Sequence, residues 1–309
     1  MSKKRQISYS GYNTYHQCPK KFQLHYEDGY RTNYIGSALV FGSMVDFYLN
    51  HLLEGTPAPA FEYQNDWIIW DKIDYAPKLL NEEQIEYALK YAEAMGYTLG
   101  VLDPIMDHLF KKMGKNGCRF LSLMTHEQKM LDVVCKICIE AKVKLIIDKY
   151  KTSILPRLSN IQKVQHPIDF QGIARGFTDF VAEYDGKLII FDNKTSKYPY
   201  MENSVAQSMQ LALYANVLNL DYGGYIVMLK DFSRGEAKIQ LIFDKIPTKM
   251  KEMTKDAIIK THEAVNSKIY PPNLSACNSM FGRRCDFYDL CHRNDDSLLT
   301  KVEPNDSRK

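Results

Sequence analysis

Four cysteines that divide between the two ends of the chain constrain its fold more than any other feature of the sequence. Cys18 lies near the N-terminus of the 309 residues, whereas Cys277, Cys285 and Cys291 lie near the C-terminus. In a reducing compartment, clustered thiols are more often metal ligands than disulfides. If one metal centre gathers all four, the two ends of the chain must meet there and enclose the segment between them.

The composition indicates a globular protein without a membrane segment. With 45% hydrophobic and 25% charged residues, the chain can bury a sizeable core in one large domain or two. No apolar leader follows Met1, and no apolar run approaches the roughly 18 residues that a membrane span requires. We therefore expect a cytoplasmic location. The net charge of only +3 permits nucleic-acid binding through a local basic patch without indicating it.

Hydrophobic patterns predict helices on both sides of a central group of strands. Thr125 and Gln128 have the spacing of a capping box at the start of one long helix. Residues 54–80, rich in Pro, Trp and Asp, are predicted to form a loop or insertion. The predicted helices cover residues 8–26, 38–53, 82–95, 104–113, 125–150, 204–218 and 247–268.

The predicted sheet is built around a β-hairpin. Its strands, over 173–184 and 187–192, flank Asp185-Gly186, which is a strong signal for a tight turn. Further strands are expected near 225–229 and 238–243. These elements divide the chain into a helical region, a core and a cysteine-bearing end, integrated in one domain. The three parts cover residues 1–160, 161–270 and 271–309.

Acidic and basic side chains collect at the polar end of this hairpin. Asp179 lies on the first strand, and Asp192 and Lys194 follow an apolar run on the second. Mg²⁺ and Mn²⁺ choose oxygen ligands, so the two carboxylates and the backbone carbonyl of Asn193 could hold one such ion. Lys194 shares a strand face with Asp192 and could stabilise charge on a phosphate that the metal polarises. Ordinary strand-end polar residues remain the alternative, because Asp-x-Lys is common by chance.

These residues resemble the core of a known family. Gly176-Phe177-Thr178-Asp179 and Ile189-Ile190-Phe191-Asp192-Asn193-Lys194-Thr195-Ser196 look like the PD-(D/E)XK nuclease superfamily. Gln210-Leu211-Ala212-Leu213-Tyr214 resembles the Gln-x-x-x-Tyr element of its RecB-like branch. The resemblance implies an α/β fold of the restriction-endonuclease-like type, with a mixed central sheet flanked by helices. It also implies catalytic roles for Asp179, Asp192, Lys194, Gln210 and Tyr214, although periodicity alone permits a buried Tyr and a solvated Gln.

An earlier segment resembles a metal-binding element of the same branch. Gly42-Ser43-Met44-Val45-Asp46 is similar to the small-residue segment that precedes a metal-binding His, with Asp46 where that His is usual. The resemblance implies that Asp46 joins Asp179, Asp192 and Asn193 as a ligand of Mg²⁺ or Mn²⁺. An aspartate would favour these hard metals. A helix-surface aspartate is the alternative.

The split cysteines complete the resemblance. Residues 15–22 and 285–291 look like the iron-sulfur module of RecB-like exonucleases of the AddB and CRISPR-adaptation type. The resemblance implies a [4Fe-4S] cluster that holds both termini together as a lid. Its ligands would be Cys18, Cys277, Cys285 and Cys291. Zinc and unliganded thiols remain open, although the wide spacing of Cys277 and Cys285 differs from the tight pairs of zinc knuckles.

The remaining cysteines are predicted to be structural. Cys135 and Cys138 have Cys-x-x-Cys spacing but lie within a patterned helix, so we expect buried small hydrophobes there, and the same at Cys118. The chain has no Gly-rich phosphate loop ending in Gly-Lys-Ser or Gly-Lys-Thr. A helicase motor would therefore come from a separate helicase or recombination protein.

Basic and aromatic residues near the hairpin suggest a path for DNA. Tyr198 and Tyr200 could stack on unpaired bases. The basic residues are Arg175, Lys194, Lys197, Arg283, Arg284 and Arg293. We expect a metal-dependent deoxyribonuclease, by resemblance an exonuclease of recombination, repair or replication that acts on single-stranded or end-containing DNA. The alternatives are a non-catalytic DNA-binding or assembly module on the same fold and a nuclease that acts on RNA.

Overall fold

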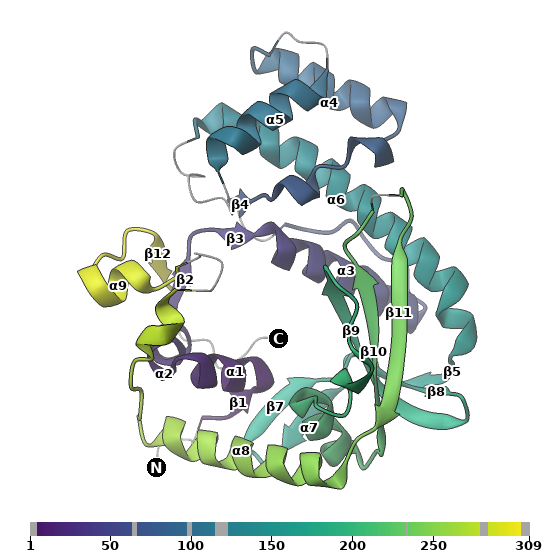
Figure 1. Ribbon diagram of the computed structural model, residues 1–309, viewed down its shortest axis with the longest axis vertical. Helices are drawn as coiled ribbons and strands as arrows, with labels where there is room; N and C mark the ends of the chain where they lie inside the picture. Colours follow the sequence, from purple (N-terminus) through teal and green to yellow (C-terminus); the bar gives the residue numbers. More distant parts are fainter. Residues whose placement is uncertain are drawn as a thin grey trace.

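The largest sheet of the described residues, called the central sheet, is mixed and has five strands (Figure 1). The computed structural model describes residues 5–63, 67–97, 101–114, 123–232, 234–278 and 284–303. The strands lie in the order β11-β10-β9-β8-β5, and all neighbours are antiparallel except β9 and β10, which are parallel. Their bounds are β5 Ser159–Gln162, β8 Phe180–Tyr184, β9 Lys187–Ser196, β10 Tyr222–Leu229 and β11 Lys238–Lys245.

The β8–β9 hairpin forms at the predicted turn. Asp185 and Gly186 have φ angles of 53° and 68°, and Tyr184 pairs with Lys187 across the turn. Two successive positive φ angles are typical of a type I′ turn, which matches the twist of antiparallel strands and favours Asp-Gly. The parallel step from β9 to β10 needs a crossover, which α7 (Met209–Leu218) provides.

The sheet separates two hydrophobic cores. Side chains alternate along β9, so that Ile189 and Phe191 belong to one core and Ile190 belongs to the other. The first core includes buried residues of α3 (Ser37–Glu54), α4 (Glu82–Ala94), α5 (Leu102–Met113) and α6 (Thr125–Ser153). The second includes residues of α1 (Tyr9–Gln17), α7 and α8 (Thr248–Asn266). The mixed α/β fold is as predicted.

The two ends of the described chain lie side by side. β2 (Tyr30–Thr32) pairs antiparallel with β12 (Leu299–Lys301), next to α9 (Tyr288–Arg293) (Figure 1). Glu27 adds ion pairs to Arg5 and to Lys268, which follows α8. The meeting of the ends therefore rests on a strand pair and on charged contacts.

The predicted helix over 8–26 is interrupted. Cys18 has an extended backbone, with φ −161° and ψ 108°, between α1 and α2 (Pro19–Phe22). Proline disfavours helical geometry at the residue before it, so Pro19 accounts for the break. A π-helical turn, Gln23–Glu27, follows α2.

The predicted strand over 173–184 is wrong, because it is two strands in different sheets. β7 (Ala174–Phe177) lies between β1 (Ile7–Ser8) and β6 (Pro167–Phe170), whereas β8 belongs to the central sheet. Asp179 therefore lies in the gap between β7 and β8, not on a strand as predicted. The predicted helix over 204–218 also begins later, since Ser208 is the N-cap of α7. Part of the predicted insertion over 54–80 is regular: β4 (Ile68–Ile69) pairs with β3 (Ile35–Gly36), and short 3₁₀ turns follow at Lys72–Asp74 and Pro77–Leu79.

Candidate active site

The gap between β7 and β8 fixes Asp179 against β9. The carboxylate Oδ2 of Asp179 accepts a 2.6 Å hydrogen bond from the backbone N–H of Asn193, and its carbonyl accepts one of 3.0 Å from Gln165. Thr178 is fully buried and donates from its N–H to the carbonyl of His166 and from its hydroxyl to that of Lys163. The turn over residues 163–166 thus fixes both Thr178 and Asp179 by hydrogen bonds.

Asn193 presents its backbone at the same edge. In a strand, the N–H and C=O of one residue point to the same side, so the Asn193 carbonyl faces the side of Asp179. The pairing of β8 with β9 begins at Phe180 and Phe191, so Asn193 lies beyond it. The side chain of Asn193 accepts a hydrogen bond of 3.4 Å from Tyr150 of α6. The backbone oxygen of Asn193, and not its side chain, is therefore the candidate metal ligand.

Asp192 and Lys194 share one face of β9. Asp192 is only 3% exposed, and its Oδ2 lies 2.5 Å from Nζ of the partly exposed Lys194. Its other oxygen, Oδ1, accepts a hydrogen bond of 3.2 Å from Nε2 of Gln210 on α7. Both oxygens of Asp192 are thus engaged, one by a cation and one by an amide.

Tyr214 lies one turn beyond Gln210 on the same face of α7 and is buried. Burial raises the pKa of its phenol to about 12, against a hydrogen bond with Gln210 that lowers it. The hydroxyl packs against Gly176 of β7, which has no side chain in the way. The structure therefore brings Gln210 and Tyr214 to Asp192 and to β7.

Asp46 approaches the acidic residues from α3. Its Oδ2 accepts a 3.2 Å hydrogen bond from Asn50, whose Oδ1 accepts one of 3.1 Å from Gln165. Burial raises the pKa of Asp46, while Asn50 and Lys194 lower it. The side chain of Gln165 thus links to Asp46 through Asn50, and its backbone contacts Asp179. Asn50 and Gln165 were not predicted from the sequence, because no motif marks residues that contact the site through other residues.

The carboxylates at this site outnumber the ammonium group beside them. The pKa of Asp179 is raised well above its usual value, first by burial and then by the charges of Asp192 and Asp46. Burial also raises the pKa of Asp192, although Lys194 opposes this shift. Burial lowers the pKa of Lys194, but Asp192 and Asp179 outweigh it, so the net pKa is raised. A site with excess carboxylate charge favours a bound cation.

The donor set suits a hard divalent metal. Mg²⁺ is commonly bound through one or two carboxylates, with waters and substrate phosphate as its other ligands. Within the described ranges, no three Asp, Glu, His or Cys side chains are close enough to hold one metal ion. Asp179 and Asp192, with the Asn193 carbonyl and the charge of Asp46 beside them, are oxygen donors of the kind that suits Mg²⁺ or Mn²⁺.

Hydrogen bonds and charge effects relate the four predicted cluster cysteines to one another or to neighbouring residues, although no three of these described thiols are close enough to hold one metal ion. Cys18 Sγ accepts a hydrogen bond of 3.4 Å from the Asn273 N–H, and the Cys277 carbonyl accepts one of 2.8 Å from Cys285. Burial raises the pKa of Cys291, and the charges of Cys285, Cys18 and Cys277 raise it further. His292, not predicted from sequence, places Nε2 3.5 Å from Cys277 Sγ.

Several of the basic residues predicted to contact DNA have local partners. Arg284 lies over the ring of Tyr288, 4.8 Å from its centroid, and Arg293 pairs with Asp289 at 3.1 Å. Arg175 and Lys197 are exposed, and Arg283 lies outside the described residues. Cys135 and Cys138 are fully buried in α6, as predicted, and Cys118 lies outside the described residues.

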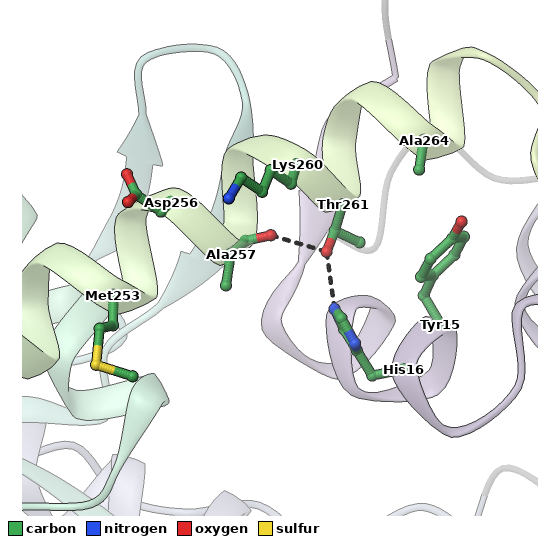
Figure 2. Close-up of a pocket in the computed structure, with 8 residues that line it drawn as sticks. All are labelled: Tyr15, His16, Met253, Asp256, Ala257, Lys260, Thr261 and Ala264. Carbon is green, nitrogen blue, oxygen red and sulfur yellow. Dashed lines mark hydrogen bonds between the residues drawn. The ribbon is translucent and has the colours of Figure 1, made fainter.

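A separate cavity of about 470 Å³ lies between α1 and α8 (Figure 2). The hydroxyl of Thr261 donates to the carbonyl of Ala257 at 2.8 Å, so it accepts the 2.9 Å hydrogen bond from His16 Nε2. Burial lowers the pKa of His16, which favours this neutral form. The acidic residues of the candidate site do not line this cavity.

The chain is similar to a solved structure and to a protein family. One solved structure, described as "Crystal structure of SSO0001", is 14% identical, with 57% of this chain and 85% of that chain covered and a TM-score of 0.25. No curated protein shows significant sequence similarity. Among the described helices, none is long and apolar enough to cross a membrane. The sequence profile of the PD-(D/E)XK nuclease superfamily matches residues 6–292, and the chain therefore belongs to this superfamily.

Proposed function

We propose that this protein is a metal-dependent deoxyribonuclease with its active centre at β9. The observation that carries the proposal is the convergence of Asp179 and Asp192 beside Lys194, with the two oxygens of Asp192 held by Lys194 and Gln210. Bound Mg²⁺ or Mn²⁺ would polarise the phosphate and lower the pKa of a bound water. Nucleic acid is the substrate class expected of the superfamily.

The chain's own residues have distinct roles in this proposal. Lys194 places its partly exposed ammonium next to the carboxylates, where it can pair with a phosphate oxygen and stabilise developing charge. Gln210 orients Asp192 through one oxygen, and Tyr214 supports Gln210 from the same helix face. Asp179, Asp192 and the Asn193 carbonyl would supply oxygen ligands, and Asp46 would add negative charge from α3.

We further propose the RecB-like branch and exonuclease action for this protein. The support is the contact between Gln210 and Asp192, because it gives the Gln-x-x-x-Tyr pair a physical connection to the acidic centre. Degradation from DNA ends would suit recombination, repair or replication, with strand opening left to a separate helicase. Circular and linear substrates of equal length would separate end-directed from internal cleavage.

The experiment is a cleavage assay with matched variants from the two ends of one hairpin. Asp192→Asn and Lys194→Met change the proposed centre. Asp185→Asn and Lys187→Met change a second Asp-x-Lys pair, which is joined by an exposed 3.3 Å ion pair at the turn. Loss of a preorganised electrostatic contact costs on the order of 100-fold or more.

We expect the first two variants to lose that much activity with Mg²⁺ or Mn²⁺, and the turn variants to stay within about twofold of wild type. Full cleavage by Asp192→Asn would overturn the assignment. A wild-type protein that binds DNA without cutting it would indicate a non-catalytic module. Preferential cutting of RNA would indicate a nuclease that acts on RNA.

We propose that Cys18, Cys277, Cys285 and Cys291 hold a structural [4Fe-4S] cluster. The support is that Cys285, Cys18 and Cys277 lie near enough to Cys291 for their charges to raise its pKa, and that the Cys285 N–H donates to the Cys277 carbonyl. Iron and zinc would be quantified in anaerobically purified protein. About four irons per chain in a brown protein would support the cluster, and stoichiometric zinc or no metal would overturn it.

A further inference from the structure

The segment that follows β9 carries large exposed side chains. Tyr198 is 66% exposed and Met201 is 75% exposed. The ammonium of Lys197 lies 5.4 Å from the centroid of the Tyr198 ring. An exposed aromatic ring beside a cation is the combination with which proteins bind unpaired nucleic acid, because the ring stacks on a base and the cation pairs with the backbone.

This segment is held in place on both sides of Tyr198. On one side, the hydroxyl of Ser196 donates to the Tyr198 carbonyl at 2.6 Å and accepts from the Tyr198 N–H at 3.2 Å. On the other, the side chain of Gln240 from β11 accepts from the Tyr200 N–H at 2.8 Å and donates to its carbonyl at 2.9 Å. A fixed loop loses little conformational entropy when it binds, so the backbone that carries the exposed ring is preorganised.

The structure separates the roles of the two tyrosines. The ring of Tyr200 packs edge-on against Tyr225 at 5.1 Å between centroids, and the hydroxyl of Tyr225 lies 2.6 Å from Oγ of Ser208. Tyr200 therefore anchors the segment to β10 and α7. Tyr198 is the ring that remains exposed to solvent.

Tyr198 lies within reach of a strand bound at the acidic centre. Tyr198 is four positions after Lys194, so their α-carbons are at most about 14 Å apart at up to roughly 3.6 Å per residue. A strand whose phosphate contacts Lys194 can therefore place a neighbouring base on this ring. In a duplex the bases stack on one another, so only an unpaired base offers its face.

We infer that Tyr198 is a stacking platform for an unpaired base of the strand at the acidic centre, and that Lys197 adds charge attraction to its backbone. The inference deepens the proposed function and rests on it for the identity of the polymer as DNA. It assigns the protein a preference for single-stranded or frayed DNA over closed duplex.

The test is equilibrium binding of a fluorescent single-stranded DNA 12-mer in metal-free buffer, followed by anisotropy, with a closed DNA hairpin duplex and a single-stranded RNA of the same sequence alongside. The variants are Tyr198→Ala and Tyr198→Phe. Tyr87→Ala, which removes a 57% exposed tyrosine from α4, is the matched control. Stacking is worth enough that Tyr198→Ala should weaken single-strand binding by about 5- to 150-fold.

We expect Tyr198→Phe and Tyr87→Ala to bind within about twofold of wild type, and duplex binding to be unchanged by all three. Wild-type affinity of Tyr198→Ala, equal weakening on single strand and duplex, or tighter binding of RNA would each overturn the inference. Because the assay contains no metal and requires no cleavage, a protein that binds single strands through Tyr198 but cuts no DNA would refute the proposed function alone.

Discussion

The hydroxyl oxygen of Tyr214 lies 2.5 Å from the position that a β-carbon at Gly176 would occupy. The phenol of α7 and the backbone of β7 are therefore in contact at the candidate active site. Any side chain at residue 176 must displace Tyr214, which is buried and cannot move without disturbing Gln210.

Gly176→Ala should therefore reduce both stability and cleavage. Overpacking of this kind costs about 1–3 kcal/mol, and displacement of Tyr214 should disturb the contact of Gln210 with Asp192. The matched control is Gly42→Ala on α3, where the new carbon would meet Thr195 Oγ1 at an ordinary 3.4 Å. Gly176→Ala should melt at a lower temperature and cleave more slowly than Gly42→Ala. Equal melting temperatures of the two variants would contradict the overpacking argument.

Asn50→Leu and Gln165→Leu should weaken the response to metal. Asn50 donates a hydrogen bond to Asp46, and Gln165 donates one to Asn50, so Gln165 supports Asp46 indirectly. Loss of such outer contacts typically costs 10- to 100-fold in metal affinity or activity. We expect the Mg²⁺ concentration for half-maximal cleavage to rise, with recovery at saturating metal. An unchanged metal titration would show that Asp46 needs no such support.

Ser208→Ala should destabilise the protein by about 1–3 kcal/mol. Ser208 caps α7 by accepting from the Leu211 N–H at 3.2 Å, and it is the partner of the buried Tyr225 hydroxyl. The double variant Ser208→Ala with Tyr225→Phe removes both polar groups and should recover part of the loss. Urea denaturation of the single and double variants measures this coupling, and strictly additive losses would argue against it.

Glu127→Gln should destabilise the protein at neutral pH but not in acid. Glu127 is buried and accepts from Lys112 twice at 2.8 Å and from the Met124 N–H at 2.8 Å. Burial raises its pKa, but these bonds outweigh burial, so the net pKa is lowered. The stabilisation is therefore complete above the unfolded-state pKa of about 4.3 and is lost as pH falls through the folded-state value.

Melting curves between neutral and acidic pH check this prediction. The difference between wild type and Glu127→Gln should be about 1–3 kcal/mol at pH 7 and should shrink as the carboxylate is protonated. Glu86→Gln removes an exposed partner of Lys90 on α4 and should leave the melting temperature unchanged. A loss that is independent of pH would point to packing instead of charge.

Local chemistry made the hairpin predictable from sequence. Asp185-Gly186 specifies its turn through positive φ angles, and alternation then places Asp192 and Lys194 on one strand face. Gln210 and Tyr214 follow from the four-residue spacing of a helix face. Each of these relations spans only a few residues, so the local sequence is sufficient to predict it.

Long-range contacts made the rest unpredictable. The gap at Asp179 depends on hydrogen bonds from the turn over 163–166, where Lys163 and Gln165 have φ angles of 53° and 46° without being glycine. The capping box at α6 is also wrong by one residue, because Glu127 bonds the Met124 N–H where Thr125 and Gln128 were expected to pair. The local sequence does not distinguish a gap at Asp179 from a continuous strand, or a capping box at Met124 from one at Thr125.

The pairing of β2 with β12 has a consequence for the order of assembly. It joins neighbours such as Asn33 and Thr300, which are separated by 267 residues, whereas the β8–β9 hairpin closes within a few. Contacts so distant in sequence form late, because a long loop must close before they are made. During synthesis β2 cannot pair with β12 until residue 301 has left the ribosome. The hairpin with Asp192 and Lys194 can therefore form on a nascent chain well before its two ends are joined.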